Sequence, residues 1–180
     1  IRPSISAQEF LSKQKGEVLD LGSGSGRNLL GLKTKAKIHL VDFSEEMIKH
    51  AKKRVKKEKI NAEFKVSRIS QIPYEDNFFD AAICVAVLHC VHSKVKRKKA
   101  LKEMYRTLKP KGKLEIEVWN KESSRFKNKN KKDIVKWRDK GTREYYFYSK
   151  QEIKEELEKI GFKIIKEIPH KVNIIFIAQK

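Results

Sequence analysis

Residues 18–28 read Val-Leu-Asp-Leu-Gly-Ser-Gly-Ser-Gly-Arg-Asn, an apolar run that leads into three alternating glycines. Glycines that follow a strand let a ligand approach the backbone closely. The dinucleotide-binding spacing G-x-G-x-x-G would need a glycine where Arg27 stands. Asp20, two residues before Gly22, would repel a pyrophosphate but suits a ligand that carries an ammonium and a sulfonium. The stretch therefore points to S-adenosylmethionine.

A second acid stands where the next strand is expected to end. Asp42 follows the run His-Leu-Val and lies 22 residues after Asp20. A carboxylate at that position can accept hydrogen bonds from both ribose hydroxyls. By itself the glycine loop could be a tight turn or could hold another nucleotide. The loop and the two acids together predict a cofactor site of the class I methyltransferase kind.

Strand-like and helix-like patterns alternate through the first two thirds of the chain. Apolar runs predict strands at 18–21, 37–42, 62–66, 80–87 and 114–119, and a closing pair at 162–168 and 172–178. Helical patterns occur at 5–14, 27–32, 44–57, 93–108 and 151–160. This order predicts an α/β, Rossmann-like fold, in which helices cover both faces of a mostly parallel seven-stranded sheet with an antiparallel terminal strand.

The chain is strongly basic. Its 180 residues fit a single domain, 39% of them are hydrophobic, and the net charge is +20. This charge favours a polyanionic partner, foremost nucleic acid, although in a Lys-rich proteome much of it would be solvated surface. Residues 94–113 hold ten Lys or Arg against one acid, and residues 121–143 hold ten against three. We expect both stretches to flank the active-site edge and to contact an RNA backbone.

The cysteine content and the lack of long apolar runs indicate in which compartment the protein acts. Cys84 and Cys90 are its only cysteines, and their spacing predicts neither a disulfide nor a metal site. We expect both to be buried, in a reducing, cytoplasmic setting. No run resembles a membrane span or a signal peptide. The chain begins at Ile1 rather than Met, so we expect a native N-terminal segment to be missing from the single domain 1–180, which carries a basic insertion at about 120–148.

Two sets of motifs resemble known families. Residues 18–28, Asp42 and the run IPYEDNFFD at 72–80 resemble S-adenosylmethionine-dependent class I methyltransferases in general. More specific runs resemble the tRNA wobble-uridine carboxymethyl methyltransferases: AVLHCV at 86–91, LKPKGKL at 108–114, VW at 118–119, DIVKW at 133–137 and REYYFY at 143–148. The resemblance covers about residues 17–165. It implies methylation of the carboxylate of 5-carboxymethyluridine at the anticodon wobble position, which gives a methyl ester.

The same resemblance implies partners and cofactor contacts. The partners are the tRNA anticodon arm and a small zinc-binding activator subunit, which we expect to pair with the edge-proximal strand at 62–66. We assign the contacts with S-adenosylmethionine to Asp20, Gly22, Ser23, Gly24, Gly26, Asp42, Phe43, Arg68, Ile69 and Ala86. The chain departs from the family at Arg68, where relatives often place an Asp that meets the adenine amine. It also departs at Cys90, Lys136 and Tyr146, where the family has His, Pro and His.

His89 and Arg143 are the leading candidates for the reacting end of the site. A carboxylate acceptor is already ionised near pH 7 and needs no strong base, so alignment and desolvation would supply most of the catalysis. His89 follows a strand predicted to be buried, where it would position the substrate, although a structural role also fits. Arg143 would grip the carboxylate, or it would be one more solvated or phosphate-contacting base.

Four aromatic residues carry a double interpretation. Tyr145, which we place with the catalytic residues, and Tyr146 could stack on a splayed-out uridine or pack in the core at the start of the last helix. Trp137 and Trp119 carry the same two interpretations, and for Trp119, at a strand end, lining the pocket is favoured.

Two other functions remain open. A class I methyltransferase could act on a small molecule or a protein instead, and the basic stretches argue against that. A noncatalytic RNA-binding protein on a methyltransferase scaffold would fit the departures at Arg68 and Tyr146.

Overall fold

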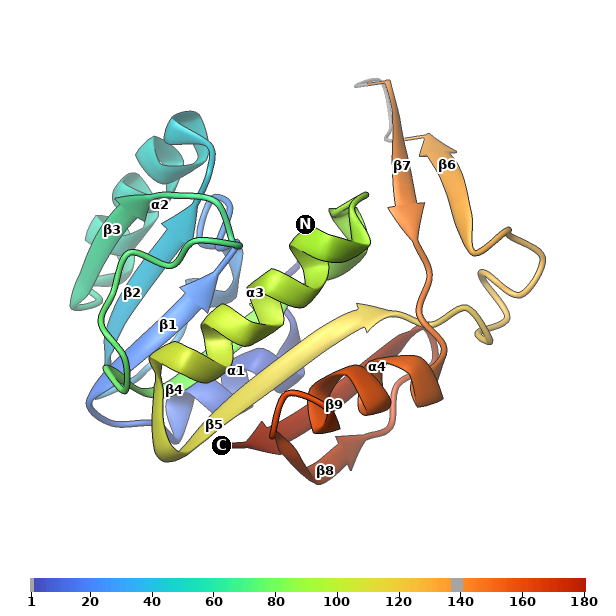
Figure 1. Cartoon of the computed structure of the whole chain (residues 1–180). Helices are drawn as coiled ribbons and strands as arrows, with labels where there is room; N and C mark the ends of the chain where they lie inside the picture. Colours follow the sequence, from blue (N-terminus) through green and yellow to red (C-terminus); the bar gives the residue numbers. More distant parts are fainter. Residues whose placement is uncertain (1, 137–140) are drawn as a thin grey trace.

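The computed structural model describes residues 2–136 and 141–180. Seven strands of the described chain form one sheet in the order β3-β2-β1-β4-β5-β9-β8 (Figure 1). They are β1 (Glu17–Leu21), β2 (Lys37–Asp42), β3 (Ala62–Val66), β4 (Phe79–Val85), β5 (Leu108–Trp119), β8 (Lys163–Ile168) and β9 (Asn173–Gln179). Strands β1 to β5 pair in parallel, and β9 runs antiparallel to both β5 and β8. The predicted sheet is confirmed, and β3 lies at its edge.

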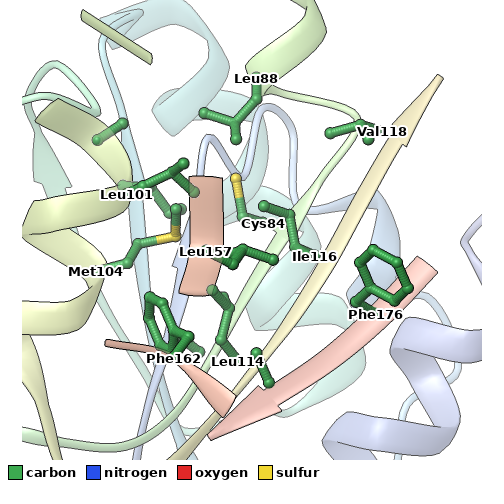
Figure 2. Packing of buried hydrophobic residues seen from close by; sticks show 14 of the residues in the cluster. Cys84, Leu88, Leu101, Met104, Leu114, Ile116, Val118, Leu157, Phe162 and Phe176 are labelled. Atoms are coloured by element: carbon green, nitrogen blue, oxygen red, sulfur yellow. The ribbon is translucent and has the colours of Figure 1, made fainter. Parts of the chain in front are cut away.

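Helices cover both faces of this sheet. The described residues form α1 (Ile5–Ser12), α2 (Glu45–Glu58), α3 (Lys94–Thr107) and α4 (Lys150–Glu158). Phe10 of α1 and Ala51 of α2 belong to the core cluster on one face. Met104 of α3 and Leu157 of α4 belong to the cluster on the other face, which Figure 2 shows around Cys84 of β4. Burial on both faces explains why β4 is almost wholly apolar. No helix of the described chain has the length and apolar character that crossing a membrane requires.

Residues 27–32 do not form the predicted helix. They contain only a short 3-10 turn, η1 (Arg27–Leu29). Gly26 and Gly31 bracket it with φ angles of +68° and +67°, in the left-handed region that ends helices. Leu29 and Leu32 are both buried in the core, and their three-residue spacing resembles one face of a helix.

Strand β5 begins earlier than predicted. Helix α3 ends at Thr107 and the strand starts at Leu108, although Pro110 and Gly112 predict a turn there. The register explains how the proline is tolerated. Leu108 pairs with Phe79 and the next partners are Lys113 and Ala81, so residues 109–112 bulge out of the ladder opposite Asp80.

Residues 120–148 contain a β-hairpin that the sequence patterns do not predict. Its strands β6 (Lys132–Lys136) and β7 (Thr142–Tyr146) form a separate two-stranded sheet, which projects beyond the main sheet in Figure 1. Tyr145 and Tyr146 therefore lie in a strand, and the expectation that they start the last helix is wrong. Trp137 lies outside the described residues.

Candidate active site

A cavity of about 320 Å³ opens at the carboxyl ends of β1, β4 and β5. Ligands of parallel sheets bind at this edge, and the volume lies at the low end of the range for small-molecule sites. The cavity brings together seven of the predicted site residues, namely Gly22, Ser23, Gly24, Ala86, His89, Arg143 and Tyr145. Six others do not line it: Asp20, Gly26, Asp42, Phe43, Arg68 and Ile69.

The glycine loop forms the floor of the cavity through its backbone geometry. Gly22 has a φ of +71°, and a Cβ there would lie 2.5 Å from Cγ2 of Val87. Gly24 has a φ of +53°, and a Cβ there would meet nothing within 4 Å. The first glycine is thus required by packing. The second keeps the backbone open to a ligand.

Two acids stand close to this loop. Asp20 is buried, and burial raises the pKa of its carboxyl to about 7 against the lowering effect of the Arg27 charge. Its Oδ2 has no hydrogen-bond partner among residues 2–136 and 141–180. At the end of β2, Oδ2 of Asp42 accepts from the Gly24 N–H at 2.8 Å, and Oδ1 accepts from the Ser44 N–H at 2.9 Å. An unpaired buried carboxylate oxygen next to open glycine backbone fits the ammonium end of S-adenosylmethionine.

The residues expected at the adenine end lie apart from the cavity. Phe43, directly after Asp42, is 73% exposed, which is unusual for a phenylalanine without a partner surface. Arg68 is exposed and Ile69 half-buried beyond the end of β3. Gly26 lies under the loop, where a Cβ would approach Leu40 at 3.3 Å.

His89 is buried on the 3-10 turn η2 (Leu88–Cys90), which follows β4. Its Nδ1 accepts from the backbone N–H of Trp119 at 3.3 Å, so the proton of the neutral ring sits on Nε2. Burial, helped by the positive charge of Arg27, lowers the pKa of His89 to about 3. At neutral pH the imidazole is therefore a hydrogen-bond donor and a flat wall, and its geometry does not suit a general base.

An aromatic cluster lines the same cavity as the glycine loop. Trp119 stacks on His89 with centroids 4.5 Å apart and an angle of 16°, and on Phe126 at 4.7 Å. Tyr145 packs against Trp119 at 4.5 Å and is only 3% exposed. Trp119 lines the cavity as favoured, while Tyr145 both lines it and packs in the cluster.

Tyr146 points to the other side of the hairpin. Its ring lies 3.7 Å from the guanidinium of Arg97, and its hydroxyl donates to Glu152. It belongs to the buried core. The hypothesis that Tyr146 stacks on a substrate base is therefore wrong, because its ring is already covered.

Seven cavity residues were not predicted, namely Arg27, Asn28, Ser25, Val85, Cys90, Glu117 and Asn173. The first two directly follow the glycine loop, so adjacency alone could have found them. Glu117 and Asn173 meet only through the pairing of β5 with β9, and no local pattern signals this. Cys84 is buried as expected, whereas Cys90 is exposed, so the expectation for Cys90 is wrong.

Part of the basic stretch 94–113 serves the fold. Arg97 is buried and donates to the carbonyls of Val91 and His92. Arg106 pairs with Glu103 and Asp76. The exposed cations of α3 that remain available to a polyanion are Lys94, Lys96, Lys98, Lys99 and Lys102. They begin directly beyond η2, close to the cavity.

Comparisons with known proteins agree with this geometry. The profile of the family described as "Methyltransferase domain" matches residues 18–112. The mouse protein named "Probable tRNA methyltransferase 9B" is 31% identical over 134 residues, which cover 72% of this chain and 28% of that protein. An Arabidopsis thaliana protein named tRNA (carboxymethyluridine(34)-5-O)-methyltransferase is 36% identical over 102 residues, which cover 57% and 24%.

A relative of another kind and a solved structure complete the comparison. A ubiquinone/menaquinone biosynthesis C-methyltransferase of Rickettsia akari is 38% identical over 105 residues, covering 53% of this chain and 41% of that protein. The crystal structure of a methyltransferase from Methanosarcina mazei superposes with a TM-score of 0.81 at 23% identity, covering 100% and 99% of the two chains. This likeness confirms the fold. The chain spans less than half the length of each of these curated relatives.

Proposed function

The chain belongs to the methyltransferase-domain family and uses S-adenosylmethionine, and on that premise we propose that it methyl-esterifies 5-carboxymethyluridine at the wobble position of a tRNA anticodon. Its relatives in mouse and Arabidopsis carry tRNA methyltransferase names. The observation that carries the proposal is the aromatic cluster of Trp119, Tyr145 and His89, which lines the same cavity as the glycine loop. Aromatic side chains at a cavity suit an unstacked base.

The roles of the residues follow from their chemistry. When bound, S-adenosylmethionine supplies a methyl group on a positively charged sulfur for in-line attack by the acceptor. Asp20 would hold the ammonium, and the backbone at Gly24 would take the close approach. His89 would donate from Nε2 to an acceptor oxygen, and Arg143 at the mouth of the cavity would orient the carboxylate. We also propose that Asp42, Phe43, Arg68 and Ile69 border the ribose and adenine.

Methyl transfer to RNA tests the proposal directly. Labelled S-adenosylmethionine is incubated with tRNA that carries 5-carboxymethyluridine, with and without a candidate activator subunit, and the product is treated with mild alkali. Label that enters tRNA and is released by alkali supports a methyl ester. Alkali-stable label moves the acceptor to a ring or sugar atom. No label in either mixture, together with transfer to small carboxylic acids, favours a small-molecule enzyme like the Rickettsia relative.

The RNA partner is supported by the charge around the cavity. We propose that the exposed lysines of α3 and the basic residues of the hairpin hold the anticodon arm. Phosphate contacts release counterions, so tRNA affinity should fall by about 10³-fold when salt rises from 50 to 200 mM. Affinity that stays constant with salt contradicts this surface. Replacing Lys96 and Lys99 should flatten the salt dependence, whereas replacing the distant Lys57 of α2 is a matched control.

We also propose a protein partner and a location. Strand β3 is the outer strand of the sheet and leaves Val66 50% exposed, which suits pairing with an activator subunit. The protein would act in the cytoplasm, where it meets tRNA. Co-purification with and without substitutions at Val66 tests the edge.

A further inference from the structure

Asn173 at the start of β9 is held in one orientation by a buried carboxylate. Its Nδ2 lies 2.5 Å from Oε1 of Glu117. The other oxygen of Glu117 accepts from the hydroxyl of Ser4 at 2.8 Å. Both oxygens of Glu117 therefore act as acceptors, and Glu117 itself is 6% exposed.

This arrangement fixes which end of the amide is free. A carboxylate offers no hydrogen to a carbonyl oxygen, so the NH₂ group of Asn173 must face Glu117. The Oδ1 atom then faces away from Glu117. It is buried and has no hydrogen-bond partner in the described chain, and a buried acceptor without a donor is costly.

Asn173 belongs to the wall of the candidate active site. Asn173 and Glu117 line the same cavity as Trp119 and His89. In the β5–β9 ladder Asn173 is the direct partner of Trp119, so the two side chains share one face of the sheet. A base bound in this cavity beside Trp119 would lie next to this amide.

We propose that Asn173 determines the base specificity of the site, with Oδ1 accepting the N3–H of a uracil ring. This inference rests on the proposed function, because it assumes a uridine substrate. Uracil carries a single ring N–H, at N3, whereas cytosine has a lone pair at that atom. Oδ1 facing that lone pair would be left unpaired, and sites built to hydrogen-bond one group reject analogues that lack it. Glu117 acts as a positioning residue, because it keeps the amide from turning over.

The experiment compares three anticodon stem-loop RNAs with the wild-type protein. They carry 5-carboxymethyluridine, its N3-methylated form, and 5-carboxymethylcytidine at the wobble position. We expect kcat/KM to be about 10- to 100-fold lower for the second and third RNAs than for the first. Equal rates on all three RNAs overturn the inference and leave the proposed function standing. No transfer to any of them, with cofactor binding intact, removes the proposed function and the inference with it.

Variants then assign the effect to the amide. Asn173→Ala should lower kcat/KM on the uridine RNA to the level of the N3-methylated RNA, while the Kd for S-adenosylmethionine stays unchanged. The Tm should fall by about 2–4 °C, because Glu117 loses a hydrogen bond. Glu117→Gln can donate to Oδ1 and lets the amide turn its NH₂ into the cavity, so it should reduce or reverse the preference for uridine over cytidine. A higher Kd for S-adenosylmethionine in Asn173→Ala, with base preference intact, overturns the inference and assigns the amide to the cofactor.

Discussion

The two ends of the cavity are built in different ways. The proposed cofactor end comes from one short segment, Gly22 to Asn28, whose position follows from one strand and three left-handed glycines. The proposed substrate end is lined by His89, Trp119, Arg143, Tyr145 and Asn173, which are scattered over more than 80 residues of chain. The first end depends on local backbone geometry. The second depends on aromatic packing and strand pairing between distant segments.

Gly22 and Gly24 give the largest expected difference within the cofactor end. Gly22→Ala places a Cβ 2.5 Å from Val87 at a φ of +71°, so we expect the Kd for S-adenosylmethionine to rise by about 100-fold and the Tm to fall by about 5 °C or more. Gly24→Ala meets open space and should cost about 1 kcal/mol in backbone strain. Calorimetry and thermal melting measure both. Equal losses of stability in the two variants would contradict the packing role of Gly22.

The pH dependence of cofactor binding should come from Asp20. Its carboxyl has a pKa raised to about 7, and only the ionised form attracts an ammonium. Affinity should therefore fall as pH falls through 7, and the Kd should rise by about tenfold or more between pH 7 and pH 5.5. Asn at position 20 removes the titration.

Asp20→Asn supplies the control for this pH effect and a second prediction, on thermal stability. The variant should bind S-adenosylmethionine weakly, with a Kd that does not change with pH. Because the raised pKa means that the folded state disfavours the ionised carboxyl, the unliganded variant should melt higher than the wild type at pH 8. A wild-type Kd that does not change between pH 7 and pH 5.5 would show that Asp20 does not meet the ammonium.

His89 should respond to pH quite differently from Asp20. Its pKa of about 3 keeps the ring neutral, so kcat at saturating cofactor should show no inflection from this group between pH 6 and pH 8. His89→Gln keeps an N–H donor and should lose about tenfold or less in kcat, and His89→Ala should lose more. An inflection near pH 6.5 that disappears in His89→Gln would instead assign His89 as a base.

Substitution of Tyr146 should have the smallest effect on activity, because this side chain packs in the core and does not line the cavity. Tyr146→Phe keeps the ring on Arg97 but loses the hydrogen bond to Glu152. We expect a loss of about 1 kcal/mol in the free energy of unfolding, or about 2–4 °C in Tm, with kcat unchanged. A lower kcat at an unchanged Tm would return Tyr146 to the active site.

The contrast between local backbone geometry and long-range packing also explains which parts of the fold and of the site were predictable from the sequence. The sheet was predictable because strands that are buried on both faces, such as β4, have almost wholly apolar sequences. The glycine loop was predictable because Gly22 and Gly24 follow Asp20 within four residues of the sequence. The helix predicted for residues 27–32 was wrong because Leu29 and Leu32 are spaced as in a helix. The positive φ angles of Gly26 and Gly31 limit the segment to a short turn.

The residues of the proposed substrate end were predictable as cavity residues only where they stand at a strand end. His89 and Trp119 meet that condition. Tyr145 and Tyr146 are neighbours of the same chemical type, and only their alternation across a strand separates cavity from core. The pair of Glu117 and Asn173 has no signal in sequence spacing, since it depends on which strand lies next to β5.

The place of β9 in the sheet has a consequence for the order in which the protein can form during synthesis. Strand β8 precedes β9 in the chain, yet β9 lies between β5 and β8. As the chain leaves the ribosome, β8 emerges with no strand to join, and β5 stays an open edge until residues 173–179 arrive. Nascent chains halted before that point should expose β5 to chaperones or to aggregation, although the glycine loop has long since been translated.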